Sequence, residues 1–181
     1  TYTIQAWRER LEDRGHEVSV VYPDGDYEPG PHEYPVPSLP NPFYEQYRFP
    51  LYRRLSTLPT FDVVHCHGPA STGLMGRRYA RKRGATSVYT HHTPVEDYLI
   101  QGLKGESAAD LAGRLYVAYE NRFLRSCDCV TASTSRIRRD VAHRQLPVGI
   151  EMDTFRPGAD GMFPDDATVI GYSGRLSAKK N

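Results

Sequence analysis

The stretch FDVVHCHGPASTGLMGRRYARKRGATSVYT, residues 61–90, contains two apolar runs on either side of a longer segment with helical spacing. We predict a buried strand over 61–66, a helix over 69–83 that ends at Gly84, and a second strand over 86–90. Strands and helices that alternate with short connections are typical of parallel βαβ units. This stretch therefore predicts an α/β fold with a Rossmann-like, doubly wound parallel sheet.

The segments before this stretch fit the same fold. The chain begins in a predicted helix that ends at Gly15, and a short strand over 17–22 follows. Because a helix that leads directly into a buried strand usually follows another strand, we expect the first strand of the sheet to be missing. Residues 23–59 hold nine of the 14 prolines, which excludes a long regular element before about residue 43.

Downstream, the alternation continues with a helix, a strand and a further helix. The first helix is predicted to open at the capping-box pair Ser107 and Asp110, the strand to cover 128–132 and the second helix to cover 135–143. Apolar residues of the first helix recur at every fourth position, and we expect all of them to face the core: Leu111, Leu115, Tyr119 and Phe123.

The end of the chain predicts a second domain. Turn-forming residues become frequent after residue 144, and a new apolar strand is predicted over 167–173. We therefore divide the chain into a first domain over 1–145, an interdomain linker over 146–164, and the first strand and loop of a second Rossmann-like domain over 165–181.

Composition and charge narrow the class of protein. Of the 181 residues, 39% are hydrophobic and 25% charged, and the net charge is +1. This profile is typical of a soluble globular domain and argues against nucleic acid as a partner. The sequence has no apolar run long enough to span a membrane and no secretory leader, and its three cysteines lack zinc-finger spacing. We expect a cytoplasmic protein with reduced thiols.

Arginine and lysine residues are concentrated over 77–83 and over 136–139. Over 43–54, aromatic residues alternate irregularly with basic ones. Each basic cluster is either a solvated helix face or a contact for anionic lipid headgroups. The interleaved stretch either packs over the sheet edge or contacts an acceptor or a membrane. The sequence leaves these alternatives open.

Polar residues follow three predicted strands at their carboxyl ends, where open α/β sheets bind ligands. The third of these strands ends at Ser133, and the first two supply four histidines, which we expect to share one cleft: His65, His67, His91 and His92. One interpretation is a metal-dependent hydrolase, since imidazole suits zinc. The other is hydrogen bonding to sugar hydroxyls and a phosphate leaving group, with His65 as a packing residue.

A second candidate site follows the predicted strand over 167–173. Gly171 and Gly174 allow a ligand to approach the backbone closely, and Arg175 and Lys180 supply fixed positive charge. Such cations offset the charge that develops on a departing diphosphate. The segment therefore predicts a phosphate contact at the start of the second domain.

Four segments match one family pattern in their order and spacing: 61–69, 90–98, 147–151 and 174–181. They resemble a strand with its loop, an acceptor-side loop, the interdomain crossover and the opening of the donor domain in the retaining family-4 glycosyltransferases of the GT-B fold. The second segment is similar to the loop of members that glucosylate diacylglycerol. The resemblance implies an N-terminal, acceptor-side fragment of a glycosyltransferase.

The resemblance also implies roles for individual residues. His92 would contact the donor sugar near the reacting carbon, and Arg175 and Lys180 would bind the donor diphosphate. Candidate acceptor or sugar contacts are His67, His91, Glu96 and Ser133. The donor would be a UDP- or GDP-sugar and the acceptor a lipid or sugar, with retention at the anomeric carbon and no metal or other cofactor. We expect the protein in the cytoplasm, with a peripheral contact to the inner face of the membrane.

The sequence differs from the family pattern in three respects. The first strand with its glycine-rich loop and almost all of the donor domain are missing, and residues 139–146 are too short for the strand that relatives carry before the crossover. Two alternatives to an active glycosyltransferase stay open: the metal-dependent hydrolase and a non-catalytic relative of the GT-B enzymes.

Overall fold

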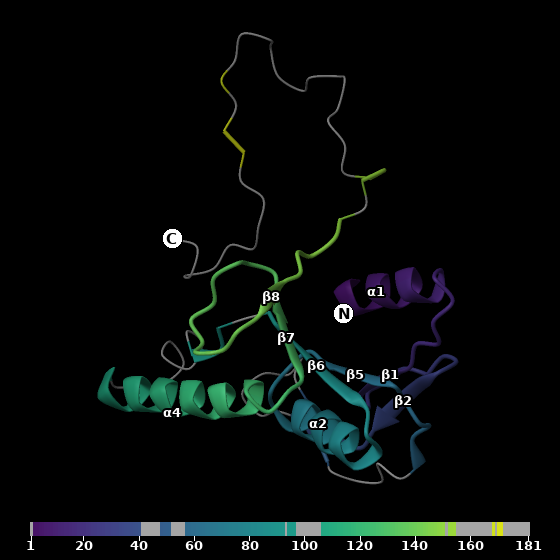
Figure 1. Ribbon diagram of the computed structural model, residues 1–181, viewed down its shortest axis with the longest axis horizontal. Helices are drawn as coiled ribbons and strands as arrows, with labels where there is room; N and C mark the ends of the chain where they lie inside the picture. Colours follow the sequence, from purple (N-terminus) through teal and green to yellow (C-terminus); the bar gives the residue numbers. More distant parts are fainter. Residues whose placement is uncertain are drawn as a thin grey trace. The chain divides into compact units, whose positions relative to one another are not determined.

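The computed structural model describes residues 2–40, 48–51, 57–92, 94–96, 106–150, 152–154, 168, 170 and 171 (Figure 1). The chain separates into two compact units, Thr1–Val148 and Gly149–Asn181. Residues 168, 170 and 171, which fall in the strand predicted over 167–173, lie outside regular secondary structure. The rest of that predicted strand, together with Arg175 and Lys180, lies outside the described residues.

The described part of the first unit alternates between strands and helices over residues 63–132, as predicted, whereas five short strands follow one another over residues 20–66. In chain order the elements are α1 (Tyr2–Glu12), β1 (Val20–Pro23), β2 (Glu33–Val36), β3 (Ser38–Pro40), β4 (Arg48–Pro50), β5 (Val63–Cys66), α2 (Ser71–Arg83), β6 (Thr86–His91), α4 (Glu106–Leu124), β7 (Cys129–Ala132) and β8 (Arg144–Gln145). Gly84 ends α2 in the left-handed conformation with a φ of 74°, and Gly15 has a φ of 84° shortly after α1. Both glycines therefore end their helices as the sequence predicts.

Four parallel strands form the central sheet, in the order β5-β6-β7-β8 (Figure 1). In this register Val63 lies opposite Thr86, and Val88 lies opposite Cys129. Because α2 connects β5 to β6 and α4 lies between β6 and β7 in the chain, the sheet is built from βαβ units. The predicted α/β fold with a parallel sheet is confirmed.

Two small sheets lie in the proline-rich part of the chain. β1 and β2 form a parallel pair, and β3 and β4 form an antiparallel pair. Each of these strands has three or four residues and contains a proline. Since proline lacks the N–H group that a strand ladder needs, the strands stay short. The proline count correctly excluded long elements but gave no signal for these pairs.

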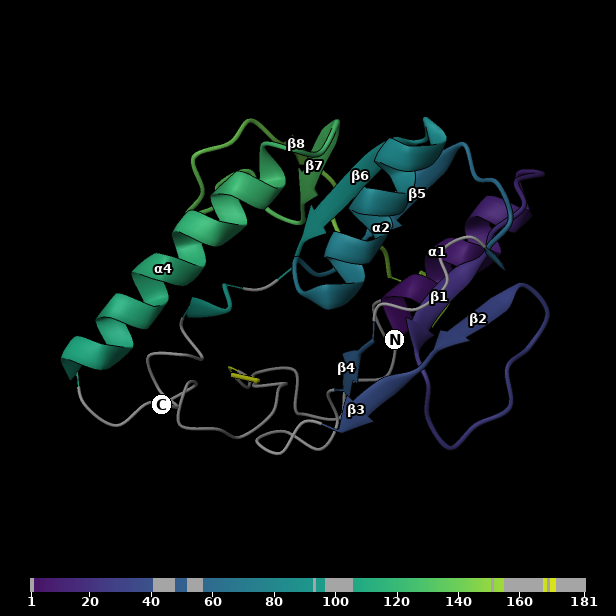
Figure 2. The same cartoon turned by 90° about the horizontal axis from the view of Figure 1, so that it is seen from below.

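The two faces of the central sheet differ because side chains alternate along each strand. One face, which we call the α2/α4 face, forms the core and packs the following residues together: Cys66, Tyr89, Phe123, Leu124 and Val130. On this face α2 packs against β5 and β6 (Figure 2). On the other face, which we call the α1 face, Trp7 of α1 stacks on His65.

Three predictions about the elements of the first unit are wrong. Residues 135–143 form bends and irregular structure instead of a helix, and the strand that we expected to be missing over 139–146 is present as β8, although it has only two residues. The 11 residues 133–143 between β7 and β8 are at the lower limit for a crossover that includes a helix. Ser107 lies inside α4 and not at its cap, because the helix already includes Glu106.

The orientation predicted for α4 is also wrong. Of the four residues expected to face the core, only Phe123 is buried, while Leu111 is 58%, Leu115 63% and Tyr119 37% exposed. The buried face of α4 passes instead through Glu120, which is fully buried. A charged residue on the inward face explains why the apolar pattern indicated the wrong side of the helix.

The described residues also show whether a helix could span a membrane and whether the cysteines are paired. None of the described helices combines the length and the hydropathy of a membrane span. All three cysteines are free, and burial raises the pKa of Cys66 to about 12 and that of Cys127 to about 11. These two thiols therefore stay protonated near pH 7 and are poor nucleophiles.

Candidate active site

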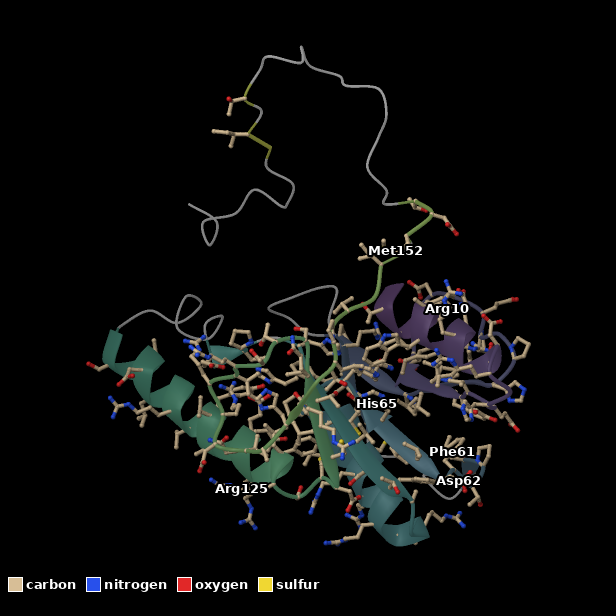
Figure 3. The ribbon with its side chains drawn as sticks, turned by 45° about the horizontal axis from the view of Figure 1, so that its top comes forward. Arg10, Phe61, Asp62, His65, Arg125 and Met152 are labelled. Atoms are coloured by element: carbon tan, nitrogen blue, oxygen red, sulfur yellow. The ribbon has the colours of Figure 1, made fainter. Side chains whose placement is uncertain are left out.

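Three histidines meet at the carboxyl ends of β5 and β6, on the α1 face, and Figure 3 labels one of them, His65. His65 belongs to β5, His67 follows that strand, and His92 comes directly after β6. His67 Nδ1 and His92 Nε2 form a hydrogen bond of 2.9 Å, and their rings stack with centroids 5.2 Å apart. The ring of His65 stacks on that of His67 at 4.3 Å. We call these three residues the histidine cluster.

Trp7 of α1 packs against the histidine cluster. Its ring centroid lies 5.3, 5.4 and 6.5 Å from the three imidazole centroids. Arg8 holds α1 in this place, because its guanidinium group donates to the Glu33 carboxylate at 3.0 Å. His92 is exposed, whereas His65 and His67 are partly buried. A ligand would therefore reach the cluster through His92.

A row of hydrogen bonds crosses the sheet next to the cluster. His65 Nε2 lies 2.6 Å from Thr90 Oγ1, which lies 2.7 Å from Thr131 Oγ1. The three residues belong to neighbouring strands, and the two threonines are 1% and 8% exposed. Since a hydroxyl group both donates and accepts, the row satisfies these buried atoms without a charge. It also fixes the orientation of the His65 ring.

The rings of the cluster are neutral near pH 7. Burial, with a smaller contribution from the neighbouring imidazoles, lowers the pKa of His65 to about 4 and that of His67 to about 3. Partial burial, with a contribution from His91, also lowers the pKa of His92. A neutral imidazole offers one N–H donor and one acceptor nitrogen. The cluster can therefore bind a hydroxyl group without presenting a cation.

His91 does not belong to the histidine cluster, so the prediction of four histidines in one cleft is wrong. Consecutive side chains of a strand point to opposite faces, and the ring of His91 lies on the α2/α4 face, 7% exposed. Its Nδ1 atom is 3.4 Å from Glu120 Oε1 but makes no hydrogen bond. Within the described residues, no three from His, Cys, Asp and Glu are placed to hold a metal ion. The described residues therefore offer no ligand set for the metal ion that the hydrolase alternative requires.

Comparison with known proteins identifies the family. The family model described as Glycosyltransferase Family 4 matches residues 2–151, which include the central sheet and the histidine cluster. The chain belongs to glycosyltransferase family 4. It is 29% identical over 171 residues to the alpha-monoglucosyldiacylglycerol synthase of Acholeplasma laidlawii. That match covers 82% of this chain and 42% of the relative, so the chain spans less than half the length of this curated protein. No solved structure matches the chain.

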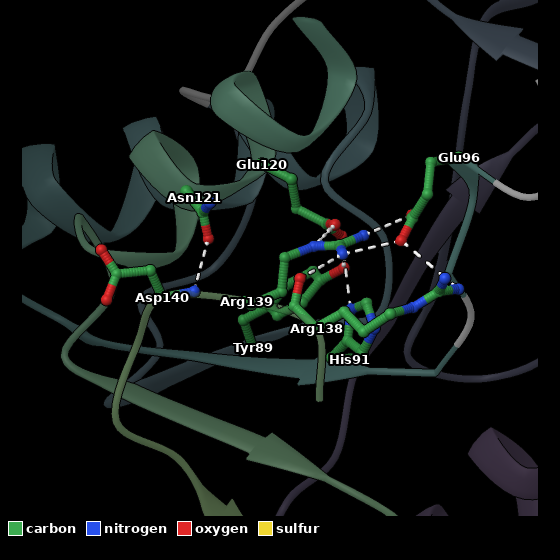
Figure 4. A network of polar contacts seen from close by, with 8 residues as sticks. All are labelled: Tyr89, His91, Glu96, Glu120, Asn121, Arg138, Arg139 and Asp140. Atoms are coloured by element: carbon green, nitrogen blue, oxygen red, sulfur yellow. Dashed lines mark hydrogen bonds and ion pairs between the residues drawn. The ribbon is translucent and has the colours of Figure 1, made fainter. Parts of the chain in front are cut away.

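This family-4 chain also holds a buried ion-pair network that the sequence did not reveal (Figure 4). Arg139 donates two hydrogen bonds to the Glu96 carboxylate, of 2.9 and 2.6 Å, and a third from Nε to Glu120. The side chains of Arg139 and Glu120 are 0% exposed and that of Glu96 is 8% exposed. Glu120 also accepts a hydrogen bond of 3.1 Å from the Tyr89 hydroxyl.

The charges of the network stabilise one another. Burial acts to raise the pKa of Glu96 and of Glu120, but the contacts with Arg139 and, for Glu120, with His91 outweigh it, and both pKa values are lowered. Burial likewise acts to lower the pKa of Arg139, and the two carboxylates raise it. A carboxylate on the inward face of a helix requires a cation nearby, but the apolar pattern of α4 did not reveal that Glu120 faces inward.

The other predicted site residues occupy different places in the family-4 chain. Glu96, predicted as an acceptor or sugar contact, directs its carboxylate to Arg139. Ser133 is partly buried directly after β7. His67 lies in the histidine cluster beside His92. The predicted donor-diphosphate residues in the second unit lie outside the described residues.

Proposed function

We propose that this family-4 chain forms the acceptor-side part of the active site in a glycosyltransferase that moves a sugar from a UDP- or GDP-sugar to an acceptor hydroxyl. One observation carries the proposal: an exposed and neutral His92 is held by His67 at the carboxyl edge of the parallel sheet. In open α/β sheets this edge is where ligands bind. The name of the A. laidlawii relative supports a lipid acceptor such as diacylglycerol.

In this proposal the residues bind and orient, and the substrates themselves exchange the proton. The neutral ring of His92 hydrogen-bonds a hydroxyl group of the donor sugar, and His67 orients that ring. The acceptor oxygen forms a bond to the anomeric carbon on the face from which the diphosphate departs, and the bond from that carbon to the phosphate oxygen breaks. Because the new bond forms on the face that the leaving group vacates, configuration is retained, and the acceptor proton moves to the departing phosphate. Arg175 and Lys180 would offset the diphosphate charge in place of a metal ion.

The test is a transfer assay with the full-length protein, using UDP-glucose or GDP-glucose and diacylglycerol in anionic vesicles. We expect His92→Ala to lower kcat at least about tenfold and His16→Ala, which replaces an exposed histidine outside the cluster, to leave it unchanged. A loss below about threefold, or roughly 0.65 kcal/mol, would remove His92 from the proposed role. Loss of activity on adding EDTA would contradict the metal-free mechanism.

We also propose that α2 holds the enzyme on the cytoplasmic face of the membrane. Arg78, Arg81 and Lys82 are exposed on this helix, and each basic residue near an anionic surface contributes about 1 kcal/mol. Replacing all three by Gln should therefore weaken binding to phosphatidylglycerol vesicles roughly 100-fold. Arg114→Gln on α4 is the matched control and should leave binding unchanged. Equal binding of the triple variant and the wild type would exclude this contact.

A further inference from the structure

The ion-pair network lies at both ends of the short segment that carries His92. His91, which precedes His92, lies next to Glu120, and Glu96, four residues after His92, is bound by Arg139. Glu120 belongs to α4 and Arg139 follows β7, so both partners come from elements outside this segment (Figure 4). The contacts therefore anchor the chain at His91, before the exposed imidazole, and at Glu96, after it.

The geometry of the pair between Glu96 and Arg139 suits a positioning role. Two parallel N–H···O bonds between a guanidinium group and a carboxylate fix both the distance and the plane of the two groups. Arg138 adds a weaker contact, with Nη2 3.7 Å from Glu96 Oε1. Because Glu96 is 8% exposed and Arg139 is fully buried, water cannot easily replace these bonds.

Stability alone gives little reason for such a network. Replacing a buried ion pair by apolar side chains of similar volume is often neutral or stabilising, and the better-attested use of buried charges is to select one conformation. The conformation at stake is that of His92, whose Nε2 lies 2.9 Å from His67 Nδ1. A displacement of this ring by about 1 Å is enough to cost a large part of the rate of a positioned reaction.

We propose that Glu96 and Arg139 are positioning residues that hold His92 against His67 in the geometry needed for transfer. The inference rests on the proposed function of His92 and assigns Glu96 a role that differs from direct contact with the acceptor. Neither side chain touches substrate in this proposal. Both act through the backbone of the segment between them and the histidine cluster.

Two variants test the proposal in the full-length enzyme, with UDP-glucose or GDP-glucose and diacylglycerol in vesicles. Glu96→Gln keeps the shape and one acceptor oxygen but loses the charge, and Arg139→Lys keeps the charge but cannot form the two-bond pair. We expect each to lower kcat about tenfold or more while KM changes less than about threefold. Asp140→Asn is the matched control, because Asp140 pairs with the exposed Arg125 beside the network, and we expect its kcat to be unchanged.

A second measurement is independent of activity. In the chain labelled with 15N-histidine, the imidazole nitrogens of His67 and His92 should show their mutual hydrogen bond, and Glu96→Gln should shift these signals while those of His65 stay in place. If Glu96→Gln lowers the melting temperature but leaves kcat of the folded enzyme and the His92 signals unchanged, the network is only structural and the proposal is overturned. If the wild type transfers no sugar, the proposed function fails, and the histidine spectra alone decide whether the network positions His92.

Discussion

Arg139→Met is the substitution with the largest expected effect on stability. The variant keeps most of the side-chain volume but leaves the carboxylates of Glu96 and Glu120 buried without their cation. Removing one partner of a buried ion pair typically costs about 3–5 kcal/mol. Glu120 keeps its hydrogen bond from Tyr89 and Glu96 keeps its contact with Arg138, so we expect a value near the middle of this range. A loss of about 4 kcal/mol lowers the folding equilibrium constant roughly 700-fold.

The dependence on pH distinguishes this cause from a simple packing defect. In the wild type both carboxyl pKa values are lowered, so their stabilising contribution is present above the unfolded pKa and is lost as the pH falls. In the variant burial acts without the cation and raises both values, so the penalty is relieved as the carboxyl groups take up protons. The difference in unfolding free energy should therefore shrink between pH 7 and about pH 5.

Urea unfolding followed by circular dichroism at both pH values measures this difference. Arg125→Met removes an exposed partner of Asp140 and should cost less than about 1 kcal/mol at either pH. If Arg139→Met costs no more than this control, or if its cost is the same at pH 5 and pH 7, the charges do not stabilise each other as argued.

Two further predictions concern the histidine cluster and the polar row beside it. In NMR titrations His65 and His67 should stay neutral down to about pH 5. The reason is that burial lowers the pKa of His65 to about 4 and that of His67 to about 3. A titration midpoint near pH 6.5 for either imidazole would refute its burial. Thr90→Val should lower the unfolding free energy by about 1–3 kcal/mol in urea, since it removes the partner of His65 Nε2. The exposed Thr86→Val in the same strand should be nearly neutral, and equal losses would contradict the role of the hydroxyl.

The part of the fold that depends on local pattern could be predicted from the sequence. Residues 61–90 form β5, α2 and β6 nearly as expected, because apolar periodicity and the glycine at position 84 are local signals. The failure over 135–143 has a different cause. Arg139 is bonded to residues 43 and 19 positions earlier in the chain, and a pattern within one segment carries no information about such partners.

The orientation of α4 shows how a buried charge misleads a prediction from periodicity. Leu111, Leu115 and Tyr119 suggested one face, but the core-facing side carries Glu120 in place of an apolar residue. A count of apolar residues assigns that position to solvent, and only the knowledge that Arg139 lies opposite makes its burial reasonable. The candidate site could be predicted as a set of polar strand ends, but not the network behind it.

The separation of His91 from His92 could have been predicted, and it has a functional consequence. Side chains alternate along a strand, so the neighbouring residues His91 and His92 lie on opposite faces of the sheet. His92 thereby reaches the exposed cluster beside His67, while His91 faces the buried Glu120 of α4. Two consecutive residues thus connect a surface that can bind a ligand to a buried ion-pair network. A movement of α4 would reach His92 through its neighbour His91, and a movement of Arg139 would reach it through Glu96, so the network is suited to positioning that ring.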